Sequence, residues 1–73
     1  MLTPSLKLLR QKMTGMWVDS RGNLTEDEAL AAPAESFAQA LRICRQYELT
    51  GMEMVMRYRF PAKDVVIPLP DTH

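Results

Sequence analysis

Residues 52–69 read MEMVMRYRF over 52–60, PAKD over 61–64 and VVIPL over 65–69, and most of the architecture can be worked out from them. Apolar and polar side chains alternate along 52–60, which is the period-two pattern of a half-buried β-strand. The pattern predicts an antiparallel hairpin with strands at 52–60 and 65–69. Because Pro68 cannot donate a ladder hydrogen bond, we expect the second strand to lie at a sheet edge or to end there.

The segment before the hairpin has helical periodicity. Its apolar positions share one face, and they are Phe37, Ala40, Leu41, Cys44 and Tyr47. Gly51 is well placed to end a helix. The spacing predicts one principal helix over about 34–48. The first hairpin strand gathers its larger apolar side chains on one face, namely Met52, Met54, Met56, Tyr58 and Phe60. We expect the helix to pack on that face.

The N-terminal third of the sequence is compatible with two secondary-structure assignments. The apolar run at 16–18 is followed by turn-forming residues at 19–23, and we expect a strand at about 13–18. Thr3 and Pro4 have the residue types that begin a helix, so a short N-terminal helix over residues 4–13 is one alternative. The other alternative is that residues 4–13 are extended.

A helix-start signal lies in the middle of the chain. Residues 25–28, Thr-Glu-Asp-Glu, fit a capping box, in which threonine and glutamate satisfy two orphan backbone N–H groups. Pro33 interrupts any helix that starts there. The sequence predicts a short turn at 26–31 and a fresh helix start at Pro33.

Size and charge set the class of protein. The chain has 73 residues, with nine basic and nine acidic side chains that sum to no net charge. We expect one domain spanning 1–73. A domain this small buries roughly 60% of the surface of its unfolded chain, so self-association would supplement its stability. Cys44 is the one cysteine, which excludes an internal disulfide and fits a reducing cytoplasm. Lys7, Arg10 and Lys12 argue against an N-terminal signal or membrane span.

The residue types that catalysis requires are sparse. His73 is the one histidine and lies at the C-terminus, so a serine or cysteine nucleophile would lack its usual base. Cys44 lies on the apolar helix face, where cysteine behaves as a small hydrophobe. One cysteine and one histidine do not make a zinc site, and the scattered glycines form no phosphate-binding loop. The sequence predicts no catalytic residues, no metal and no cofactor.

Two surfaces compete as a binding site. Residues 57–60 alternate arginine with aromatic residues, as nucleic-acid-binding sheets do. Alternation nevertheless places Arg57 and Arg59 on one face and the aromatic rings on the other. Zero net charge also provides no general attraction to phosphates. Nucleic acid is therefore the alternative rather than the favoured partner.

The second surface is apolar. The chain has six methionines, which form either an unusually Met-rich core or an interface, because methionine favours surfaces that repack against a partner. Trp17 is of the type that anchors either a core or an interface. The edge strand at 65–69 offers backbone groups to a second copy. We expect a homodimer with an unidentified protein partner and no membrane association.

The sequence thus predicts an α+β fold with a three-stranded, mainly antiparallel sheet (13–18, 52–60 and 65–69) and one helix at 34–48. The expected function is that of a non-enzymatic, cytoplasmic protein-interaction module that self-associates. The candidate interaction residues are Trp17, Met54, Met56, Arg57, Tyr58 and Arg59. The size and plan also suit the small accessory or inhibitor proteins of bacteria and phages, by analogy of architecture alone.

Overall fold

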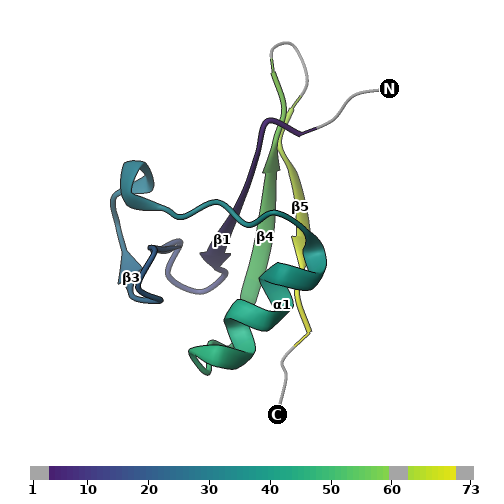
Figure 1. Cartoon of the computed structure of the whole chain (residues 1–73). Coiled ribbons are helices and arrows are strands. Elements are labelled where there is room, and N and C mark those ends of the chain that lie inside the picture. The colour runs from purple at the N-terminus through teal and green to yellow at the C-terminus, as the bar shows by residue number, and fades with distance from the viewer. Residues whose placement is uncertain (1–3, 60–62, 71–73) are drawn as a thin grey trace.

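The computed structural model describes residues 4–59 and 63–70 (Figure 1). In chain order the elements are β1 (Leu6–Gln11), β2 (Trp17–Val18), β3 (Leu24–Thr25), the 3₁₀ helix η1 (Glu28–Leu30), α1 (Phe37–Gln46), β4 (Met52–Arg57) and β5 (Val65–Pro68). The strands form one antiparallel sheet in the order β3-β2-β1-β4-β5, and α1 lies on one face of it. This is the predicted α+β class.

The hairpin is confirmed as an antiparallel pair of β4 and β5. β4 ends at Arg57, whereas the predicted strand runs on to residue 60. Phe60, the predicted end of that strand, and residues 61–62 lie outside the described residues, as do Thr3 and His73.

The sheet has five strands rather than the predicted three, and the largest difference is β1. Six residue pairs join β1 to β4, from Leu6 opposite Arg57 to Gln11 opposite Met52. Leu8 and Leu9 are both buried although they point to opposite faces. A strand buries adjacent residues on its two faces, whereas a helix buries one stripe. The N-terminal helix is therefore wrong, and the extended alternative is right for β1.

A strand is present where one was predicted at 13–18, but it is only the two-residue β2, because a turn occupies the residues before it. The Gln11 N–H donates to the Met16 carbonyl, and the Gly15 N–H donates to the Gln11 carbonyl, both at 2.8 Å. Gly15 has a φ of +73°, which suits glycine in such a turn. Met13 lies in this turn with 91% of its surface exposed.

The predicted turn at 19–23 is present and leads into β3, a strand of two residues that the sequence did not indicate. The Asp19 carboxylate accepts hydrogen bonds from the backbone N–H groups of Arg21 and Asn23, both at 2.9 Å. Such side-chain bonds are why aspartate favours turns.

α1 begins at Phe37, later than the predicted start at Pro33. Ser36 caps the helix, with its hydroxyl accepting from the Gln39 N–H at 3.1 Å. The residues before it are extended because their backbone groups bond to the sheet. The Ala32 N–H donates to the Val18 carbonyl at 3.0 Å, and the Ala34 N–H donates to the Lys7 carbonyl at 2.7 Å.

The predicted turn at 26–31 is present as η1, but the predicted capping box is wrong, because Asp27 and not Thr25 caps the turn. The Thr25 hydroxyl accepts from the Asp27 N–H at 3.1 Å, and the Asp27 carboxylate accepts from the Ala29 N–H at 3.0 Å. Asp27 is therefore the N-cap of η1. The Glu28 side chain points to Arg57 instead of the preceding backbone.

The main core lies between α1 and the sheet. Its buried members are Leu9, Val18, Ala34, Ala40, Cys44, Met52, Met54 and Leu69. The predicted apolar face of α1 is confirmed at Ala40 and Cys44, whereas Phe37 and Tyr47 at its two ends are exposed. Met52 and Met54 are thus core residues, and Met56 packs half-buried against them.

The C-terminus of α1 ends in a Schellman motif. The Leu49 N–H donates to the Cys44 carbonyl at 2.8 Å, and the Glu48 N–H donates to the Arg45 carbonyl at 3.3 Å. Glu48 occupies the left-handed position, with a φ of +54°. A residue with a Cβ is strained there.

Glu48→Gly should raise the free energy of unfolding by about 0.5–1 kcal/mol, because glycine adopts that φ without a steric cost. Urea denaturation followed by circular dichroism would measure the change. Gln46→Gly, two residues earlier at the last position of α1, should instead lower the free energy of unfolding by about 0.5–1 kcal/mol. If the two variants shifted in the same direction, this account of the helix end would be wrong.

Candidate functional site

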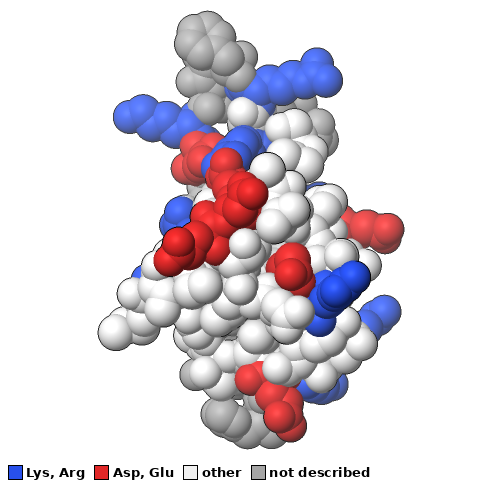
Figure 2. All heavy atoms as spheres, turned by 90° about the vertical axis from the view of Figure 1, so that its left-hand side faces the viewer, with Lys and Arg blue, Asp and Glu red and all other residues white. Residues whose placement is uncertain are grey.

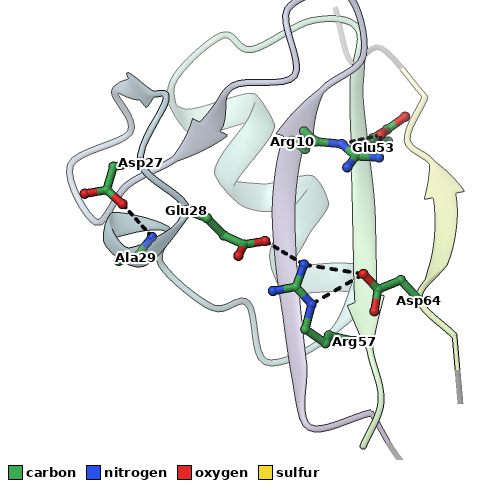
Figure 3. A network of polar contacts seen from close by, with 7 residues as sticks. All are labelled: Arg10, Asp27, Glu28, Ala29, Glu53, Arg57 and Asp64. Carbon is green, nitrogen blue, oxygen red and sulfur yellow. Dashed lines mark hydrogen bonds and ion pairs between the residues drawn. The ribbon is translucent and has the colours of Figure 1, made fainter. Parts of the chain in front are cut away.

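The sheet face opposite α1 carries a second, smaller cluster built around Trp17. Leu8 on β1 lies directly opposite Val55 on β4, and both are buried. Trp17 covers them and is itself only 8% exposed, with Ala31 packed alongside. This face is seen in Figure 3, where α1 lies behind the sheet.

Two arginines cover the Trp17 indole. The guanidinium carbons of Arg10 and Arg57 lie 5.4 Å and 6.0 Å from the ring centroid. Both distances fall in the range of cation–π interactions.

Each of the two arginines forms an ion pair with at least one carboxylate. Arg10 lies directly opposite Glu53 on β4, and its Nε donates to Glu53 Oε2 at 2.7 Å. Arg57 Nη2 donates to Glu28 Oε1 at 2.5 Å and also approaches Asp64 Oδ2 at 3.4 Å (Figure 3). Arg57 therefore connects β4 to the residue preceding β5 and to η1, which lies 29 residues earlier in the sequence.

The Arg57–Glu28 pair shifts both pKa values. The hydrogen bond from Arg57 holds the pKa of Glu28 below its ordinary value, and the same bond raises the pKa of Arg57. The side chains of Arg57 and Glu28 are 33% and 42% exposed, so water screens their attraction. The pair is worth well under about 1 kcal/mol.

Because the pKa of Glu28 is lower in the folded protein, its ion pair stabilises the fold above the ordinary carboxyl pKa. That contribution is lost as the pH falls through the folded-state value. Glu28→Gln should therefore lower the free energy of unfolding by about 0.5 kcal/mol or less at pH 7, and should match the parent protein near pH 3. Urea denaturation at both pH values would measure this. Glu26→Gln, an exposed neighbour, is the control, and an equal loss for Glu28→Gln at both pH values would contradict the assignment.

The structure brings together two of the six candidate residues, Trp17 and Arg57. Met54 and Met56 lie on the α1 face instead. Tyr58 follows β4 half-buried, and Arg59 is exposed. Four charged members of the cluster were not among the candidate interaction residues, namely Arg10, Glu28, Glu53 and Asp64. The opposite charges of Arg10 and Glu53 would have indicated a cross-strand pair if residues 4–13 had been assigned as a strand.

The carboxylates in this region outnumber the arginines, with Glu28, Glu53 and Asp64 against Arg10 and Arg57. Figure 2 shows acidic side chains gathered beside basic ones in the upper half of the face that it draws. A phosphate that approached Arg57 would have to compete with the carboxylates of Glu28 and Asp64. The geometry at Arg57 gives no support to the nucleic-acid alternative.

The outer edge of β5 is a second candidate surface. The Leu69 N–H donates to the Met52 carbonyl at 3.0 Å, which fixes the alternation along the strand. Residues 65 and 67 therefore direct their backbone groups toward β4, and Val66 and Pro68 direct theirs away from the sheet. Pro68, which has no N–H, lies at a sheet edge as predicted. Val65 and Val66 are 43% and 44% exposed.

The opposite edge of the sheet offers few open backbone groups. Beside β1 lie the two-residue strand β2 and, farther along, the extended segment 32–34. β3 presents an edge of only two residues, and an isolated bridge joins Asp19, the residue after β2, to Ala31. Among the described strands, β5 has the longest open edge.

Within residues 4–59 and 63–70, no three His, Cys, Asp or Glu side chains are grouped in a way that could hold a metal ion. The helices in the same part of the chain lack the length and apolar character needed to cross a bilayer. No family model matches the chain, and comparisons with curated proteins and with solved structures give no match either.

Proposed function

We propose that this protein is a non-enzymatic, cytoplasmic interaction module that self-associates through the edge of β5. One observation carries the proposal. The backbone N–H and carbonyl of Val66 point away from β4 at the edge of the sheet, where the side chains of Val65 and Val66 are both exposed. The cytoplasmic assignment rests on Cys44 being the one cysteine, which suits a reducing compartment.

The energetics favour pairing at this edge. A second strand would satisfy the outward N–H and carbonyl of Val66 while removing valine surface from water, which contributes about 25 cal/mol per Å². Edge strands of proteins are commonly protected against pairing with another chain by charged side chains, bulges or proline. β5 has no charged residue between Val65 and Pro68, and its proline comes only at the last position.

The expected dimer is weak. Stable interfaces bury on the order of 1,200–2,000 Å², and a strand of four residues supplies only a small part of that on its own. Association should therefore follow mass action, with dissociation on dilution. The contact is largely apolar and backbone-mediated, so added salt should weaken it little.

Val66→Pro tests the proposal. Because the Val66 N–H faces away from β4, proline there should leave the β4–β5 ladder intact and remove the donor that a second copy needs. Light scattering over a range of concentrations should show a mass that rises toward the dimer for the parent chain and stays at the monomer for Val66→Pro. Val66→Thr keeps the N–H and the β-branched shape, and it should still associate.

A monomeric parent chain at every concentration would contradict the proposal. So would a monomer that copurifies with nucleic acid, recognised by its absorbance ratio, and releases it in high salt. In that case Arg57→Glu combined with Arg59→Glu should abolish the binding, and the nucleic-acid alternative would replace the present one.

A further inference from the structure

We infer that the two copies pair in an antiparallel register with a twofold axis at Val66. This inference rests on the proposed self-association at β5 and specifies its geometry. Outward backbone groups alternate with inward ones, so an outward residue must face an outward residue of the second copy. With Val66 opposite Val66, the two residues exchange both of their hydrogen bonds, and each Asp64 N–H can donate to the Pro68 carbonyl of the other copy.

The residues along the edge favour this register over those centred on Asp64, Val65 and Pro68. Val66 lies opposite Val66 of the second copy on the open face, and Val65 lies opposite Ile67 on the α1 face. The Asp64 side chain lies opposite Pro68, which is uncharged. Centring the axis on Asp64 would oppose like charges, which is destabilising. Centring it on Pro68 would leave no N–H donor at the middle of the interface. Centring it on Val65 would set the Asp64 carboxylate beside Val66.

The register determines the shape of the dimer. Neighbouring antiparallel strands are related by a twofold axis perpendicular to the sheet, so equivalent faces of the two copies lie on the same side. The two five-stranded sheets would join edge to edge, with both α1 helices on one face. The opposite face would carry two Trp17 clusters on either side of the Val66 pair. A protein partner would meet a twofold-symmetric surface of mixed charge.

Cysteine trapping tests the register. Val66→Cys places two thiols on residues whose Cα atoms are about 5.5 Å apart, which is within disulfide range. Val65→Cys is the matched control, because Val65 is almost equally exposed but would face Ile67, too far from its own copy to be bridged. Cys44 is buried and should not compete in the folded protein. After mild oxidation, the covalent dimer is read on a non-reducing gel.

Efficient cross-linking of Val66→Cys with little for Val65→Cys supports the inference. Preferential cross-linking of Val65→Cys would overturn the register while leaving edge pairing in place. A dimeric mass with no cross-linking of either variant would overturn the register and the use of β5 together. A monomeric mass at every concentration would contradict the proposed self-association as well. The failure of the register and the failure of the proposed function are therefore distinguishable.

Discussion

Trp17→Ala should lower the free energy of unfolding by about 3–5 kcal/mol, the usual cost of removing a large buried aromatic side chain. Trp17 is 8% exposed and covers Leu8 and Val55 on the face that α1 does not reach. Its loss would expose both and would remove the ring on which Arg10 and Arg57 lie. Native domains have only about 5–15 kcal/mol of stability, so this loss removes a large fraction of it.

Circular dichroism during urea denaturation would measure the loss, because the variant has no tryptophan to follow by fluorescence. Trp17→Phe retains an aromatic side chain at the centre of the cluster and should recover a large part of the stability. Met13→Ala removes an apolar side chain that is 91% exposed and should change the stability by less than about 0.5 kcal/mol. Parent-like stability of Trp17→Ala would mean that the second cluster is not a core.

Gly22→Ala should cost about 2–3 kcal/mol, the second largest effect expected. Gly22 has a φ of +81°, at which a Cβ alone costs roughly 1 kcal/mol. A Cβ on Gly22 would also overlap the ring of Tyr47, with its Cγ and both Cδ atoms in the way. The whole ring would have to move, and such overpacking costs about another 1–2 kcal/mol.

Gly15→Ala separates the two contributions. Gly15 has a similar φ of +73°, but nothing lies within 4 Å of the position of its added Cβ, so only the backbone cost should be measured. In a Tyr47→Ala background, Gly22→Ala should fall to the same cost, and the double-mutant cycle then gives the energy of the ring contact. Equal losses for Gly22→Ala and Gly15→Ala in the parent chain would show that Tyr47 does not rest on the turn.

The parts of the fold that could be predicted are those with a local signal. The hairpin has alternating residues on β4 and a β-branched run on β5, and the helix has a stripe at helical spacing. β1 has no comparable signal, because Leu6, Leu9 and Met13 also fit a helical stripe. Its state depends on pairing with β4, more than forty residues away, and such pairing overrides local propensity. β2 and β3 are too short to show any period.

The candidate site could be predicted only in part for the same reason. Trp17 and Arg57 stand out by residue type, but the cluster depends on which residues lie opposite one another. The register of β1 on β4 sets Arg10 beside Glu53. The path of the chain through η1 then brings Glu28 to Arg57. Neither relation can be read from spacing along the sequence.

Residue-resolved hydrogen exchange of the Val66 amide, measured over a range of protein concentrations, tests self-association at β5 most directly. In one copy alone this N–H faces solvent, whereas the Val65 and Ile67 amides face β4. We expect protection of Val66 to rise with concentration in step with the dimer fraction, while Val65 and Ile67 are protected throughout. Fast exchange of Val66 at every concentration, with its two neighbours protected, would contradict the account.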